Sequence, residues 1–175
     1  LNIPAYDIFL YWRWTVAAQR RKMKTYKHSK KASQRSLGSL SVINVGEQKC
    51  VPSYKWGPGV RDHYLIHYIV SGKGIYRVHG ETFHLSAGDV FLVLPNTEVE
   101  YSADSNDPWT YIWVGFAGTD AAAMVDSTDF SPARPILEKP AFGSELSKDL
   151  RKINESFGSS FRDAVEMTGR LYLAL

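Results

Sequence analysis

The sequence of 175 residues has little of what marks several large classes of protein. Its single cysteine, Cys50, cannot form an internal disulfide, and there is no group of cysteines to hold a structural zinc. Asp7 and Arg13 interrupt the apolar residues 1–18, which fall short of the roughly 20 apolar residues of a membrane helix. No basic segment precedes them, as a secretory signal requires. We therefore expect a cytoplasmic protein with no membrane partner.

Acidic residues are missing from one stretch. Residues 20–35 contain eight Lys and Arg and no Asp or Glu, which leaves thirteen of the 21 basic residues against all 18 acidic ones elsewhere. A nucleic-acid-binding domain needs a basic stripe on its folded surface, and this acidic body does not provide one. We interpret residues 1–37 as a basic arm or extension, solvated and mobile, with no assigned function.

From residue 40 the chain consists of short segments rich in β-branched and aromatic residues, separated by Gly, Pro and Asp. The pattern predicts six strands, at residues 64–70, 75–78, 82–85, 90–94, 98–102 and 109–116. Their connections are too short for crossover helices, so the sheet must be antiparallel. A sandwich or small barrel over residues 38–118 is the expected architecture.

After Gly118 the apolar pattern takes on helical spacing. One stripe of the first predicted helix consists of Leu146, Leu150, Ile153 and Phe157. Ser144 is expected to be the N-cap of this helix, and Ser160 with Asp163 forms a capping box for a second. No Gly or Pro follows the second helix, so we expect the chain to be a piece of a longer protein.

Residues 61–118 carry three motifs in a fixed order, HYIVSGKG, AGDVFLVLPN and DPWTYIWVGFAG. In these motifs the chain resembles the N-terminal sensor and dimerisation domain of AraC-type transcription regulators. The resemblance implies a cupin-like antiparallel β-barrel, also called a double-stranded β-helix, followed by a helical pair. It further implies that residues 119–175 are a tail that joins two subunits. DNA would be bound only by helix-turn-helix units that lie beyond this chain.

Enzymatic cupins hold a metal with two His and a Glu from one motif and a His from a second. The corresponding positions in this sequence are Gly59, Arg61, Leu65 and Val99. His63 and His67 remain, but four residues on a strand span roughly 13 Å, which is too far for two ligands of one ion. We therefore predict no metal, no cofactor and no enzymatic activity, with a metal-dependent cupin enzyme as the alternative.

Aromatic residues give the clearest indication of a ligand. Strand alternation over residues 109–116 places Trp109, Tyr111 and Trp113 on one face and the residues between them on the other. Such a face suits a sugar, whose C–H groups pack on indole, although an aromatic strand is also typical of a core. The resemblance implies that Trp113 stacks on the sugar and that Tyr111 and Tyr101 line the same pocket.

Two further residues are candidates for the pocket. His67 shares a strand face with Leu65, whose position points into the barrel in cupins, so it is either a pocket residue or a core histidine bonded to backbone. Arg61 lies at the entrance to the first predicted strand of the resembling region. It either meets hydroxyls or a carboxylate of a ligand, or forms a surface salt bridge with Asp62 or Glu100.

These observations predict a sugar-sensing and dimerisation domain of a bacterial AraC-type regulator. The residues predicted to join two subunits are Leu146, Leu150, Ile153 and Phe157. The apolar surface of the two helices exceeds what one side of a small barrel needs, which favours a homodimer over a helix pair that packs wholly on its own barrel. A dimerisation module whose barrel holds no ligand is the remaining alternative.

Overall fold

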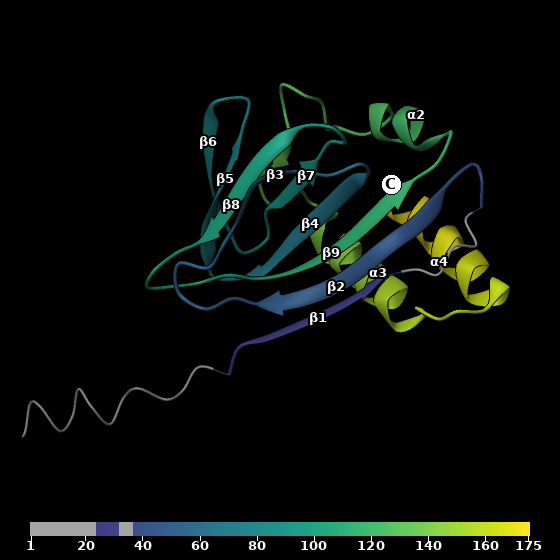
Figure 1. Cartoon of the computed structure of the whole chain (residues 1–175), viewed down its shortest axis with the longest axis horizontal. Coiled ribbons are helices and arrows are strands. Elements are labelled where there is room, and N and C mark those ends of the chain that lie inside the picture. Colours follow the sequence, from purple (N-terminus) through teal and green to yellow (C-terminus); the bar gives the residue numbers. More distant parts are fainter. Residues whose placement is uncertain (1–23, 32–36) are drawn as a thin grey trace, which may run out of the picture.

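A computed structural model describes residues 24–31 and 37–175 (Figure 1). The strands of the larger sheet are β1 (Tyr26–Lys31), β2 (Ser41–Lys49), β4 (Tyr64–Ser71), β7 (Val90–Val93), β9 (Thr110–Ala117) and β10 (Ile136–Leu137). Those of the smaller sheet are β3 (Lys55–Val60), β5 (Lys73–Val78), β6 (Glu81–Ser86) and β8 (Glu98–Ala103). The helices are α2 (Ala121–Asp126), α3 (Gly143–Glu155) and α4 (Phe161–Ala174). The apolar residues 1–18 and part of the basic segment lie outside the described residues.

The two sheets face each other in a cupin-like arrangement. The larger has the order β1-β2-β9-β4-β7-β10 and the smaller the order β3-β8-β5-β6, with neighbouring strands antiparallel. The six predicted strands are confirmed as β4 to β9. Among the described residues, the sheets do not join edge to edge into one hydrogen-bonded cylinder, so the cupin-like fold is an open sandwich.

Strand β9 lies in the middle of the larger sheet and is covered on both faces. Trp109, which directly precedes the strand, and Tyr111 and Trp113 of the strand itself belong to the core between the two sheets. Ile112 and Val114 belong to a second core between the larger sheet and the helices, which cover its outer face (Figure 1). The alternation predicted for this strand is confirmed.

Six residues of the basic segment form a strand, and not a mobile arm as predicted. Its residues 26–31 form β1, an edge strand that pairs with β2 over its six residues. All six side chains are exposed, because the strand is held by backbone hydrogen bonds and not by apolar burial. The Nζ of Lys30 also donates to the carbonyl of Asn154, 2.9 Å away, which ties β1 to α3.

The two long helices begin differently. The prediction that Ser144 is the N-cap of α3 is wrong, because the N-cap is Phe142, whose side chain makes no capping hydrogen bond. The chain already turns before Ser144, where the Gly143 N–H donates to the carbonyl of Pro140. The capping box of α4 is confirmed, since the Ser160 hydroxyl and the Asp163 carboxylate each accept from the other's backbone N–H. In the described part of the chain, no helix is sufficiently long and apolar to cross a membrane.

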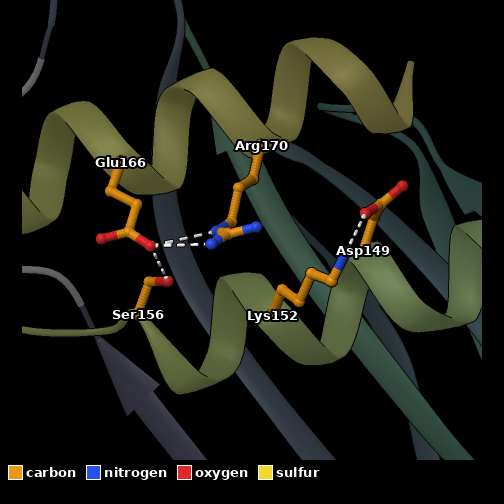
Figure 2. A network of polar contacts seen from close by, with 5 residues as sticks. All are labelled: Asp149, Lys152, Ser156, Glu166 and Arg170. Carbon is orange, nitrogen blue, oxygen red and sulfur yellow. Dashed lines mark hydrogen bonds and ion pairs between the residues drawn. The ribbon is translucent and has the colours of Figure 1, made fainter.

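Polar contacts link α3 to α4 on their outer side (Figure 2). The hydroxyl of Ser156, at the end of α3, donates to Glu166 of α4 over 2.9 Å. Arg170 donates to the same carboxylate oxygen from one turn further along α4, also over 2.9 Å. These groups lie at the surface, where an ion pair adds little to stability.

The stripe of α3 packs inside its own subunit. Leu146, Leu150 and Ile153 are 3%, 1% and 0% exposed and belong to the core under the larger sheet, and Phe157 packs against the edge of that core. The sheet of the same chain already covers these side chains. Leu146, Leu150 and Ile153 therefore leave almost no surface for a partner, contrary to their predicted role in dimerisation, whereas Phe157 is only partly buried.

We predict that Leu150→Ala lowers the free energy of unfolding by about 2–5 kcal/mol, because it removes a fully buried side chain and leaves a cavity. Urea denaturation followed by circular dichroism measures the change. The matched control is Leu173→Ala on α4, where the side chain is 79% exposed and the expected change is within about 0.5 kcal/mol. Equal effects of the two substitutions would contradict the burial of the α3 stripe.

Candidate functional site

A cavity of about 550 Å³ opens between the two sheets. It is lined by all five side chains predicted for the pocket: Trp113, Tyr111, Tyr101, His67 and Arg61. They come from β9, β8, β4 and the connection between β3 and β4. On one side the cavity is lined by Lys27, Ser29 and Lys31 of β1. The strands thus bring together residues that are more than fifty positions apart in the sequence.

His67 lies in the wall formed by β4 and is 1% exposed. Its ring stacks on Phe91 with a centroid distance of 4.3 Å and an interplanar angle of 3°. Burial, together with the nearby charge of Arg61, lowers the pKa of His67 to about 3, so the ring is neutral at neutral pH. Its Nδ1 is buried and has no hydrogen-bond partner, so the alternative of a backbone-bonded histidine does not hold for this nitrogen.

Trp113 forms part of the wall contributed by β9. Its indole lies against Gly46, the residue opposite it on β2, where an added Cβ would be 2.3 Å from Cζ2 of the ring. The indole Nε1 donates to Oδ1 of Asn44, two residues earlier on β2, over 2.9 Å. The side chain is 7% exposed and lines the cavity, so its position depends on both β2 residues.

An aromatic layer from the smaller sheet lines the same cavity. Trp56 of β3 stacks on Tyr101 of β8 with a centroid distance of 5.1 Å and an interplanar angle of 16°. The guanidinium carbon of Arg61 lies 4.3 Å from the centre of the Trp56 ring, which is a cation–π contact. Arg61 Nε is buried and has no hydrogen-bond partner within the protein.

The alternative interpretation of Arg61, a surface salt bridge with Asp62 or Glu100, is wrong. Asp62 bonds to His63 over 2.6 Å, and Glu100 pairs with Lys55, also over 2.6 Å. The two carboxylates therefore have other partners, and the guanidinium of Arg61 packs on an aromatic ring instead.

The two tyrosines of the cavity supply neutral hydroxyl groups. The Tyr111 hydroxyl donates to Oε1 of Gln48 on β2 over 3.3 Å. Burial raises the pKa of Tyr111 and of Tyr101 well above the usual value, so both stay protonated at neutral pH. Hydroxyl and amide groups such as these form hydrogen bonds with uncharged polar ligands.

Sequence reasoning missed several residues that line the cavity: Asn44, Gln48, Trp56, Asp62, His63 and Asn96. Two of them share a face of β2, a strand that was not predicted. The available signal was the period of two in Asn44, Gly46 and Gln48, which alternate with Val45 and Glu47. Pairing of β2 with β9 makes this face part of the cavity.

The cupin ligand positions Leu65 and Val99 are buried apolar residues in this fold. Among residues 24–31 and 37–175, no three His, Cys, Asp or Glu side chains come together in a group that could hold a metal ion.

The low pKa of His67 has a consequence for stability. In the unfolded chain a histidine has a pKa of about 6.5, so below that pH the unfolded state binds a proton that the folded state does not. Stability is therefore lost as the pH falls from about 6.5 towards 3. Because of this histidine, the free energy of unfolding measured by urea denaturation should fall by roughly 2 kcal/mol between pH 7 and pH 5. In His67→Gln this contribution to the pH dependence should be absent. Identical pH dependence of the two proteins would contradict a buried, neutral His67.

The chain is similar to known regulators. The family described as "AraC-like ligand binding domain" matches residues 44–175. The "Msm operon regulatory protein" of Streptococcus mutans serotype c is 45% identical over 82 residues, which are 47% of this chain and 30% of that protein.

Two further relatives have similar coverage. The "Raffinose operon transcriptional regulatory protein RafR" of Pediococcus pentosaceus is 41% identical over 92 residues, which are 50% of this chain and 33% of that protein. The "Lactose operon transcription activator" of Staphylococcus xylosus is 36% identical over 88 residues, 50% of this chain and 32% of that protein. The matched part is thus about a third of each relative. Because the family match extends over most of this chain, the chain belongs to the AraC-like ligand binding domain family.

Proposed function

We propose that this chain is the effector-sensing domain of an AraC-type transcription regulator and that its effector is a sugar. The observation that carries the proposal is the cavity of about 550 Å³, with Trp113 in its wall and neutral polar groups around it. This volume lies within the range of about 300–1,000 Å³ that small-molecule sites occupy. The names of two relatives, which mention a raffinose operon and a lactose operon, support the same class of ligand.

The chemistry of the wall suits a pyranose ring. The C–H face of a sugar packs on the flat face of an indole, and its hydroxyl groups need donors and acceptors at the rim of that contact. Arg61 offers a guanidinium donor, and His67 offers a neutral ring nitrogen without a partner. Gln48 supplies an amide whose oxygen already accepts from the Tyr111 hydroxyl. This set matches an uncharged, hydroxyl-rich ligand.

We further propose that the sugar is bound without being turned over. The competing function is a metal-dependent cupin enzyme, and metal analysis of the purified protein together with chromatography of the incubated sugar separates the two. A stoichiometric first-row metal, or a converted sugar, would favour the enzyme. A dimerisation module with an unused cavity would instead give no thermal shift with any sugar.

We predict that raffinose or lactose raises the melting temperature of the domain and changes its tryptophan fluorescence. Trp113→Ala should weaken the binding measured by calorimetry by about tenfold, because the stacking surface is lost. The matched control is Trp109→Phe, since Trp109 is fully buried and does not line the cavity. Retained affinity in Trp113→Ala would refute the stacking role of this residue.

We also propose that the chain forms a homodimer through α4. Three apolar side chains lie along one face of this helix and are at least 40% exposed: Phe161, Val165 and Tyr172. Gly169, also on α4, would accept a Cβ without meeting any atom within 4 Å, so another backbone can approach there. A second copy is the natural occupant, because a regulator that addresses two half-sites requires two paired subunits.

Light scattering across a dilution series tests the α4 interface. We predict a dimer at tens of micromolar that Val165→Glu converts to a monomer, because a carboxylate in an apolar contact is left without a partner. The matched control is Val51→Glu, at a loop position with 46% exposure against 47% for Val165. A monomeric parent protein, or a dimer that survives Val165→Glu, would argue against this interface.

A further inference from the structure

A chain of hydrogen bonds connects the cavity wall to the protein surface. Trp113 Nε1 lies 2.9 Å from Asn44 Oδ1, and Asn44 Nδ2 lies 2.8 Å from His63 Nε2. His63 Nδ1 in turn lies 2.6 Å from Asp62 Oδ1. All four side chains line the cavity, and the exposed fraction is 7% for Trp113 at one end and 92% for the Asp62 side chain at the other.

The Trp113–Asn44 hydrogen bond determines which atom is the donor in each of the other two bonds. An indole N–H can only donate, so Asn44 must present its oxygen to Trp113 and its amino group to His63. The amino group can only donate, so His63 Nε2 must be an acceptor without a proton. The proton of the neutral ring then lies on Nδ1 and is donated to Asp62. All three hydrogen bonds can form together only while His63 is neutral.

Two glycines make room for this arrangement. A Cβ at Gly115 on β9 would lie 2.7 Å from Asn44 Nδ2 and 2.9 Å from His63 Nε2. A Cβ at Gly46 on β2 would lie 2.3 Å from the Trp113 ring. A side chain at either position would collide with the hydrogen-bonded groups. The contacts therefore require glycine at both positions.

We propose that Asn44 and His63 are positioning residues that hold the indole of Trp113 in place, and that protonation of His63 releases it. A proton added to Nε2 faces the amino group of Asn44, and two donors cannot bond to each other. If Asn44 turns its oxygen towards His63, its amino group then faces the indole N–H, so one of the two bonds is always lost. The value of this device for sugar binding rests on the proposed function, under which an acidic pH weakens binding.

Of the two histidines that line the cavity, His63 is the one that takes part in these hydrogen bonds. Histidine is the side chain that ordinarily changes its charge between about pH 5 and 8. The second histidine of the cavity, His67, has its pKa lowered to about 3 by burial and stays neutral in that range. The charged side chains that line the described cavity with His63 are Asp62 and Arg61 from its own loop and Lys27 and Lys31 from β1.

Asp62 accepts the last of the three hydrogen bonds, the one from His63 Nδ1. Its pKa is lowered, most of all by the hydrogen bond from His63, so the carboxylate remains an acceptor for the Nδ1 proton in both charge states of the ring. Protonation therefore leaves the Asp62–His63 bond in place and acts on the Asn44 side. This predicts that the change appears at Trp113 and not at the surface.

The indole N–H signals of the sugar-free protein test the proposal by ¹H–¹⁵N NMR, with the Trp113 signal assigned from its absence in Trp113→Phe. Between pH 7.5 and 5.5 the Trp113 signal should move together with the ring signals of His63. In His63→Gln, whose side-chain oxygen accepts from Asn44 but does not titrate, the Trp113 signal should stay fixed. In Asn44→Leu it should lie at the position of an unbonded indole at both pH values.

The proposal is overturned if the chemical shift of the Trp113 indole changes with pH to the same extent in the parent protein and in His63→Gln, or if it changes in neither. The Trp109 indole, which has no hydrogen-bond partner, serves as the internal control and should not follow His63. Because no sugar is present, the outcome does not depend on the proposed function. Failure of raffinose and lactose to bind, with a Trp113 signal that still follows His63, would refute the sugar proposal alone.

Discussion

Burial of strand β9 on both faces is the constraint on which the rest of the structure depends. Its outward residues, such as Ile112 and Val114, pack with aliphatic side chains of α3 and α4. Its inward residues Tyr111 and Trp113 meet the smaller sheet, where large rings and polar groups leave a cavity. The helices thus stabilise the sheet from one side, and the ligand site forms on the other.

Between the two sheets the cavity combines aromatic surface with the neutral polar groups of His67, Tyr101 and Tyr111. His67 is kept neutral by burial, and the tyrosine hydroxyls stay protonated for the same reason. The charged side chains of the lining are Arg61, whose guanidinium lies over the ring of Trp56, and Asp62, Lys27 and Lys31. Hydroxyl groups and flat aromatic faces lie side by side in this lining, which is the basis of the proposal that the ligand is a sugar.

Much of this was predictable from the sequence where the signal is local. Turn residues and alternation located β4 to β9, and the resemblance selected five side chains that do line one cavity. Strand β2 and the side chains of Asn44 and Gln48 could not be located, because their importance comes from pairing with β9 more than sixty residues away. The α3 stripe was assigned to a partner because apolar spacing shows that a helix face is buried, but not what covers it.

A crystal structure of the domain with raffinose or lactose, whichever gives the larger thermal shift, tests the central claim most directly. The account predicts a pyranose ring stacked on the indole of Trp113, with hydroxyl groups within hydrogen-bond distance of His67 and Arg61. A sugar bound outside the cavity, or a sugar inside it that leaves Trp113 uncovered, would contradict the account.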